Sequence, residues 1–383
     1  MVEHPEAPEE SVTPTQNMAE GQEQEDDLDP LGAPKTWSDG EDSGVPDPHY
    51  VEVLHESNET SRNILTNRSS AFLANLSRRF SARIEAILTF QGTPAAGQAP
   101  PENWKAGISE AMVGGRVVDL TGPAFGEEFL TGVKATRGTY TAILSDEWPE
   151  VMEGHRAIRQ LLAGVQYYRT KGEPEPDVLE GEANVSLKLR PLHELDNNLI
   201  LHRRPMACAL RDFGLYAFFN GPDVQVRGEN LDVTIRDVNN VEIAELWRDI
   251  FEYTEDALEL AGGTLTATLE FSSLEGIGQA ENIAFIARMF ANGLTIDKSG
   301  LLDAGAKKKD YESAAKSISA LCAKVGLSGI APIYDGKISA EPTEKEVAAA
   351  VKEFEAQKAL GFSASQVVNP ALLKHGIQVF KHY

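Results

Sequence analysis

The chain has 383 residues, of which 42% are hydrophobic and 25% charged, an ordinary composition for a soluble protein with a large core. Its formal net charge of −24 argues against nucleic acid as a partner. No apolar run approaches the roughly 18 residues of a membrane span. The acidic N-terminus lacks the apolar stretch of a secretory signal, and the two cysteines, Cys208 and Cys322, have no metal-ligand spacing. We therefore expect a cytoplasmic protein without a membrane or nucleic-acid partner.

Residues 1–57 carry much of the negative charge. They contain sixteen acidic residues and one basic residue, Lys35, and few large apolar side chains. Such a composition cannot bury enough surface to fold, so the sequence predicts a disordered acidic tail. The alternative is that this tail is a docking segment for a basic protein partner.

Residues 58–114 form the next predicted unit. Apolar residues recur at three- and four-residue steps from Ile64 to Leu88, which predicts a helix over residues 58–91. Residues 92–102 are rich in Gly, Pro and Ala and predict a linker. We expect this helical segment to precede one large domain that spans residues 115–383.

Eight short apolar runs organise residues 115–383, and a helix-like stretch follows each of them. The runs are Val117–Leu120, Thr139–Leu144, Leu199–Leu201, Val233–Ile235, Thr264–Leu269, Leu294–Ile296, Gly329–Ile333 and Ser365–Val368. Eight strands that alternate with helices predict an α/β fold, a (β/α)8 TIM barrel, with an N-terminal helical extension and the acidic tail. Barrels of this type place their chemistry on the loops that follow the strands.

Helical periodicity marks several of the stretches between the runs. The predicted helices are Glu242–Leu260, Glu281–Phe290, Tyr311–Val325 and Thr343–Leu360, with a last short helix at Pro370–Tyr383. Residues 171–182 are acidic and rich in Pro and Gly, and predict a surface loop.

Several segments resemble malate synthase, the family that condenses acetyl-CoA with glyoxylate on a (β/α)8 barrel. Asp212–Asn220 (DFGLYAFFN) is close to the family's D-F-G-L-Y-F-F-H-N, and Arg116–Pro123 is similar to its R-V-E-I-T-G-P first strand. Further matches follow in order over residues 62–383: Ile64–Phe80, Trp104, Leu246–Trp247, Gly263–Thr268 and Asn369–Leu372. The resemblance implies the barrel fold and a condensing or lyase-like ancestry.

The positions that carry chemistry in that family differ here. Ser272 and Gly300 stand where the family has its two Mg²⁺ carboxylates, and neither supplies the charged oxygen ligand that a hard dication needs. His202–Pro205 stands where we align the family's V-R-P-R-G-W, whose arginine stabilises the enolate. The family's catalytic aspartate lies in a C-terminal helical domain beyond the barrel, and this chain ends soon after the eighth run. We therefore expect no metal site and no Mg²⁺ cofactor.

Ionisable side chains at the predicted strand ends form the candidate site. The catalytic candidates combine a general acid or base, cationic clamps and carboxylates: His202, Arg203, Arg204, Glu270 and Asp297. The candidates for substrate binding are Arg236, Asp237, Ser272, Lys298 and Asn369, with Lys298 able to replace a metal's positive charge. Glu270 alternates with apolar neighbours, so it faces either the barrel interior or the helix layer. The alternative is that these are the charged loops of any acidic protein.

Two kinds of function remain open. In the first, the chain is an enzyme of altered C–C bond or acyl-CoA chemistry in specialised metabolism, acting on an anionic small molecule or an acyl-CoA. In the second, it is a non-catalytic pseudoenzyme that serves as a binding or regulatory partner. Ordinary malate synthase activity in the glyoxylate cycle is a further alternative, which the missing ligands and base disfavour.

Overall fold

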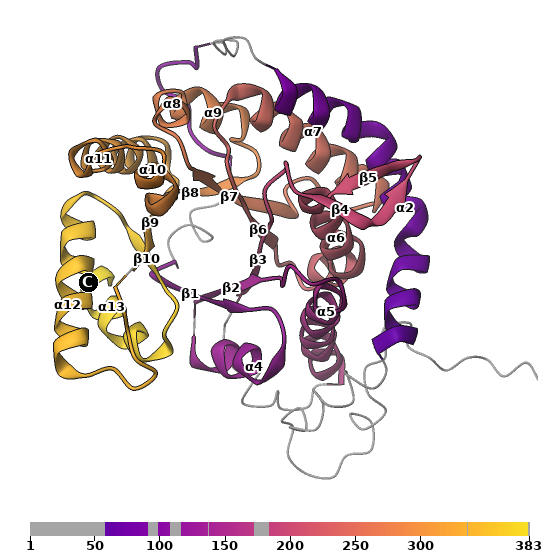
Figure 1. Ribbon diagram of the computed structural model, residues 1–383, viewed down its shortest axis with the longest axis horizontal. Coiled ribbons are helices and arrows are strands. Elements are labelled where there is room, and N and C mark those ends of the chain that lie inside the picture. Colours follow the sequence, from indigo (N-terminus) through magenta and orange to yellow (C-terminus); the bar gives the residue numbers. More distant parts are fainter. Residues whose placement is uncertain are drawn as a thin grey trace, which may run out of the picture.

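In the computed structural model, which describes residues 58–90, 99–107, 116–136, 138–171, 184–334 and 336–381, eight parallel strands close into a barrel surrounded by helices (Figure 1). Around the barrel the order is β1, β10, β9, β8, β7, β6, β3, β2. The barrel strands are β1 (Val118–Pro123), β2 (Thr139–Ile143), β3 (Asn184–Lys188), β6 (Leu231–Ile235), β7 (Leu265–Phe271), β8 (Ala291–Ile296), β9 (Ser328–Ile333) and β10 (Ala364–Val367). The predicted α/β barrel is therefore confirmed.

Helices cover the outer face of the strands. They are α4 (Gly126–Ala135), α5 (Trp148–Lys171), α6 (Cys208–Val226), α7 (Val241–Ala257), α8 (Leu274–Gly278), α9 (Ala280–Ile286), α10 (Lys298–Asp303), α11 (Lys308–Val325), α12 (Glu344–Ala359), the 3-10 helix η2 (Pro370–Leu372) and α13 (Leu373–Phe380). The helices predicted from periodicity correspond to α7, α9, α11 and α12, and the last one to η2 and α13. No helix in the described part of the chain is both long enough and apolar enough to cross a membrane.

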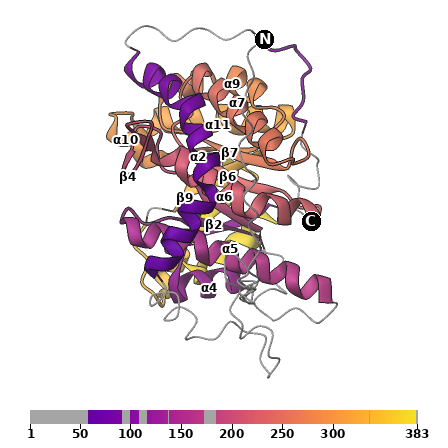
Figure 2. The same ribbon diagram turned by 90° about the vertical axis from the view of Figure 1, so that its right-hand side faces the viewer.

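The predicted N-terminal helix is α2 (Asn58–Thr89). It contacts α5, α6 and α7 and runs along the outside of the barrel (Figure 2). Phe72, Leu73, Leu76 and Phe80 are buried in this contact, because they recur on one side of the helix. The acidic tail, most of the predicted linker and residues 172–182 of the predicted loop lie outside the described residues, whereas Lys171 is the last residue of α5. The proposed domain boundaries stay a prediction.

The third strand of the barrel is β3, so the prediction that Leu199–Leu201 is a barrel strand is wrong, although this run does lie in a strand. That run belongs to β4 (Leu195–Leu201), which pairs antiparallel with β5 (Arg204–Ala207) in a hairpin separate from the barrel sheet. The search for apolar runs missed β3, because its sequence Asn-Val-Ser-Leu-Lys has apolar side chains only at alternate positions. An apolar run is easier to recognise than an alternation of five residues.

Alternation also explains the unusual interior of this barrel. Interiors of this fold are ordinarily filled by branched apolar side chains. Here Thr266 donates a hydrogen bond to Asp232 (3.0 Å), and Arg116 donates one to Thr268 (2.7 Å). The register carries the same inward face through further buried polar side chains: Asp119, Thr121, Thr141, Ser186 and Thr234. The apolar residues between them face the helices and form the core.

Charge is buried in this interior near the amino ends of the strands. Arg116 forms an ion pair with Asp119 (2.7 Å) and lies 4.0 Å from Asp232. Burial raises the pKa of both carboxyl groups, and the positive charge of Arg116 opposes this rise. The two carboxylates therefore depend on one guanidinium.

We expect Arg116→Met to lower the free energy of unfolding by about 3–5 kcal/mol, because it leaves buried acidic groups without their counter-charge. Arg204→Met is the matched control: Arg204 pairs with Glu85 at an exposed position, so its loss should cost about 0–1 kcal/mol. Urea-induced unfolding followed by tryptophan fluorescence measures both. An equal loss of unfolding free energy in the two variants would contradict the stabilising role of Arg116 in the barrel interior.

Candidate functional site

Three charged side chains meet inside the carboxyl end of the barrel. Glu270 on β7 shares the inward face of Thr266 and Thr268, which settles its direction: it faces the barrel interior. Its side chain is 6% exposed, and its Oε2 accepts a hydrogen bond from Nζ of Lys188 at 2.6 Å. Nε of Arg236 lies 3.4 Å from Oε1. One buried carboxylate is therefore held between two cations that come from β3 and from the residue after β6.

Asp297 follows β8 and adds a second carboxylate to this end of the barrel. It caps α10 by accepting hydrogen bonds from the Gly300 N–H (2.9 Å) and the Ser299 hydroxyl (2.8 Å). Burial raises the pKa of Asp297, but these two hydrogen bonds and the positive charges of Lys188 and Arg236 together bring it below its ordinary value. Asp297 is therefore linked by charge to the Lys188–Glu270–Arg236 cluster.

Ser272 and Asp237, two of the predicted substrate-binding residues, contact one another after β7 and β6. The Ser272 hydroxyl donates to the Asp237 carboxylate (2.5 Å) and accepts from the Asn239 side-chain amide (2.8 Å). Asp237 has a positive φ of 57°, which Asp tolerates better than most residues. These contacts fix the loop beside Glu270.

The residues present do not fit a magnesium ion. The Ser272 hydroxyl is already hydrogen-bonded to Asp237 and Asn239. Gly300 has no side chain that could bind a metal, and there is little room for one, because a Cβ there would come within 2.7 Å of the Asp297 carboxylate. Glu270 already faces two cations, which would repel a dication. Within the described residues, no three His, Cys, Asp or Glu side chains form a group that could hold a metal.

His202, Arg203 and Arg204 do not lie at the mouth of the barrel, and the prediction that they converge there is wrong. His202 and Arg203 form the turn of the β4–β5 hairpin, with φ of 51° and 66°, as in a tight two-residue hairpin turn. A ring nitrogen of His202 lies 3.1 Å from the Ala74 carbonyl oxygen of α2, and Arg204 pairs with Glu85. His202 and Arg204 thus attach the hairpin to α2.

Two further predicted residues have structural partners. Lys298 points outward to Glu353 on α12 (3.3 Å) and lies over the Tyr311 ring, so it does not replace a metal's charge at the mouth. Asn369 caps η2 by accepting from the Ala371 N–H, and it donates to the Ser339 carbonyl. Neither joins the cluster around Glu270.

Sequence reasoning missed Lys188 and Arg190 because it misplaced the third strand. Since Arg190 and Pro191 follow β3, they occupy the place of the family's V-R-P better than Arg204 and Pro205 do. The period-two alternation of Asn184–Lys188, followed by this Arg-Pro pair, is the signal that could have found them.

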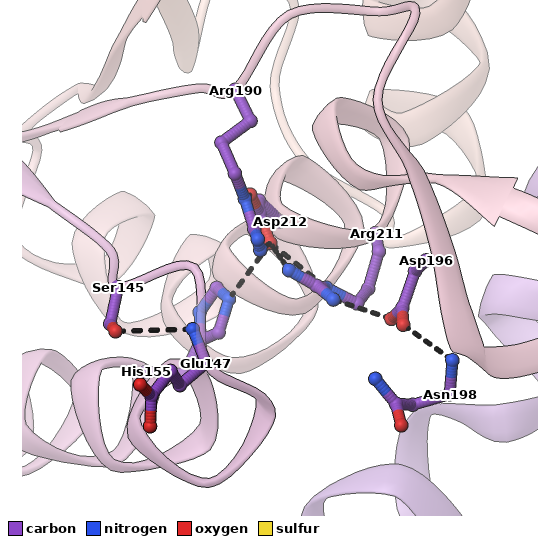
Figure 3. A network of polar contacts seen from close by, with 8 residues as sticks. All are labelled: Ser145, Glu147, His155, Arg190, Asp196, Asn198, Arg211 and Asp212. Atoms are coloured by element: carbon purple, nitrogen blue, oxygen red, sulfur yellow. Dashed lines mark hydrogen bonds and ion pairs between the residues drawn. The ribbon is translucent and has the colours of Figure 1, made fainter.

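Arg190 is held by a buried network (Figure 3). Its guanidinium donates two hydrogen bonds to Asp212 on α6, at 2.9 and 3.0 Å. Asp212 also accepts from Arg211, which in turn pairs with Asp196 of β4, and His155 of α5 lies 3.8 Å away. The network joins the hairpin and α6 to the loop after β3.

The chain is similar to malate synthases at low sequence identity. No protein-family model matches the chain. Malate synthase of Oryza sativa subsp. japonica is 25% identical over 273 residues, which cover 64% of this chain and 48% of that protein. Malate synthase of Myxococcus xanthus is 23% identical, with 64% and 47% covered. The chain thus spans about half the length of these relatives.

Among solved structures, the citrate lyase beta subunit of Mycobacterium tuberculosis, complexed with oxaloacetate and magnesium, aligns over 71% of this chain and 99% of that one. The TM-score is 0.44 at 11% identity, and nothing is concluded about this chain from that likeness. The barrel and the curated relatives agree with the resemblance in the sequence: the chain is a divergent malate-synthase-like barrel.

We expect Asp297→Asn to lower the free energy of unfolding at neutral pH, because the amide keeps the helix cap but loses the charge facing Lys188 and Arg236. Since the folded-state pKa is lowered, the carboxylate contributes stability above the unfolded value of about 3.9 and loses it as the pH falls through the folded value. Urea titrations of both proteins from neutral to acidic pH should show the difference narrowing below about pH 4. A constant difference would show that the charge contributes nothing.

Proposed function

We propose that this chain is an enzyme that forms or breaks a C–C bond next to the carbonyl group of a small 2-oxo acid, with an acyl-CoA as the second substrate or product. The observation that carries the proposal is the Lys188–Glu270–Arg236 cluster at the end of the barrel where such folds place their chemistry. The malate synthases among its relatives support the type of reaction.

The cluster supplies the two kinds of group that such chemistry needs. Forming a carbanion beside a carbonyl requires a base at the carbon and a positive group near the developing negative charge. Glu270 is a buried carboxylate, and Lys188 and Arg236 are the cations. While its Nε faces Glu270, the Arg236 side chain is still 33% exposed, so its guanidinium can be reached by a substrate carboxylate.

Apolar side chains lie next to the charged cluster, because Ile143 of β2 is the register partner of Lys188. Ile143 at the end of β2 shares the inward face of Thr141, and Val368 follows the end of β10 directly. Their side chains are well exposed for apolar residues, at 42% and 55%. Charged groups with exposed apolar surface next to them suit a substrate with a carboxylate head and an acyl portion.

A thermal-shift measurement tests binding at this site. Pyruvate, glyoxylate or oxaloacetate should raise the melting temperature with or without magnesium, since a ligand that binds the native state stabilises it. Arg236→Ala should remove most of this shift, whereas Arg204→Ala on the hairpin should keep it. The reverse result would place the anion site on the hairpin and sink the proposal.

Activity assays distinguish the proposal that the chain is an enzyme from the alternative that it only binds a ligand. Because the magnesium ligands do not fit, we expect no magnesium-dependent release of thiol from acetyl-CoA and glyoxylate, measured with a thiol reagent against an EDTA control. Screening 2-oxo acids with several acyl-CoAs should instead reveal a metal-independent reaction. Binding without turnover for every pair would favour the non-catalytic alternative.

A further inference from the structure

Lys188 is placed as a reacting group in the barrel. Its side chain is on the inward face of β3, at the last residue of the strand, and is 16% exposed. The register sets it beside Ile143 of β2 and Thr234 of β6, whose side chains are an alkyl group and a hydroxyl. Its ammonium group is therefore enclosed, reachable from the mouth, and has Glu270 as its close polar partner at 2.6 Å.

Glu270 is shared between two cations, and this distinguishes the pair from an ordinary ion pair. Its Oε2 receives the Lys188 hydrogen bond while Oε1 faces Arg236 at 3.4 Å. If Lys188 gives its proton to Glu270, Arg236 still holds the site's positive charge for a substrate carboxylate. The proton therefore has an acceptor within hydrogen-bond distance, and an amine can form without a solvent base.

We infer that Lys188 is a nucleophile that forms an imine with the carbonyl carbon of a 2-oxo acid. The inference rests on the proposed function and assigns the group that activates its substrate. Lysine amines react in this way with carbonyl substrates when the amine is desolvated or lies next to another cationic group, and Arg236, which shares Glu270 with Lys188, is that cation here.

The step balances without an oxidant or reductant. Lys188 transfers a proton to Glu270, and the resulting amine attacks the carbonyl carbon. An N–C bond forms, and the carbonyl oxygen becomes a hydroxyl group by taking a proton from the same nitrogen. The nitrogen lone pair then expels this hydroxyl, which leaves as water with the proton held by Glu270. The product is a protonated imine, with Glu270 again a carboxylate.

A protonated imine supplies the electron-withdrawing group that this site otherwise lacks. It withdraws electrons from the neighbouring carbon, so a C–C bond there can form or break without a metal-bound enolate. This agrees with the poor fit of Ser272 and Gly300 to magnesium. Arg236 would hold the carboxylate of the 2-oxo acid, and Glu270 would be the base for the adjacent carbon.

Reductive trapping tests the inference. The intact protein is incubated with pyruvate and sodium cyanoborohydride, and the adduct is measured by mass spectrometry of the whole chain and of its peptides. We expect one reduced pyruvate per chain, located on Lys188. Lys188→Arg keeps the positive charge and should show at least a tenfold loss of this adduct. Lys298→Arg, which alters an outward lysine paired with Glu353, should be labelled like the wild type.

The melting temperature with pyruvate separates this inference from the proposed function. If pyruvate stabilises the wild type but no adduct forms at Lys188, the imine is wrong while the binding site stands. If there is neither a shift nor an adduct, both proposals fail. Adducts spread equally over surface lysines in the wild type and in Lys188→Arg also overturn the inference. Stabilisation of Lys188→Arg together with the loss of its adduct supports both.

Discussion

A carboxylate buried at the end of a strand is costly unless cations lie within reach, and Glu270 meets this constraint through Lys188 and Arg236. The two partners come from strands on one side of β7, so the carboxyl ends of β3, β6 and β7 must keep their register for the charges to balance. The same register places Ile143 and Thr234 beside Lys188. The ion pairs of Glu270 and the register of β3, β6 and β7 therefore depend on each other at this end of the barrel.

The loop after β3 must also be held in place, and the residues that hold it lie outside the barrel. The β4–β5 hairpin is inserted between β3 and α6, and Arg211 links its Asp196 to Asp212, which also holds Arg190. Removing one member of such a buried network leaves charges without partners, which costs more than the network contributes relative to an apolar core. The loop after β3 is thus positioned by contacts with α6 and the hairpin as well as by the strand itself.

Much of the fold could be predicted because the outward faces of the strands are apolar and the helices are periodic. Val233–Ile235 and Leu294–Ile296 lie within β6 and β8, and Glu270 and Asp297 were found because they close such runs. The third strand failed because Val185 and Leu187 are its two apolar residues, whereas Leu199–Leu201 in the hairpin looks more like a strand. The partners of each charge could not be predicted, since pairs such as Lys188 and Glu270 are 82 positions apart.

The inward face of hydroxyl and charged groups also bears on how stability depends on temperature. Exposing apolar surface on unfolding raises the heat capacity, whereas exposing polar surface lowers it. Thr121, Thr141, Ser186, Thr234 and Thr268 occupy places that branched apolar residues fill in most barrels. Unfolding this barrel should therefore have a smaller heat-capacity change than unfolding an apolar-filled barrel of the same length. Its stability curve is broader and flatter, so the molecule keeps a larger share of its maximum stability on cooling and on moderate heating.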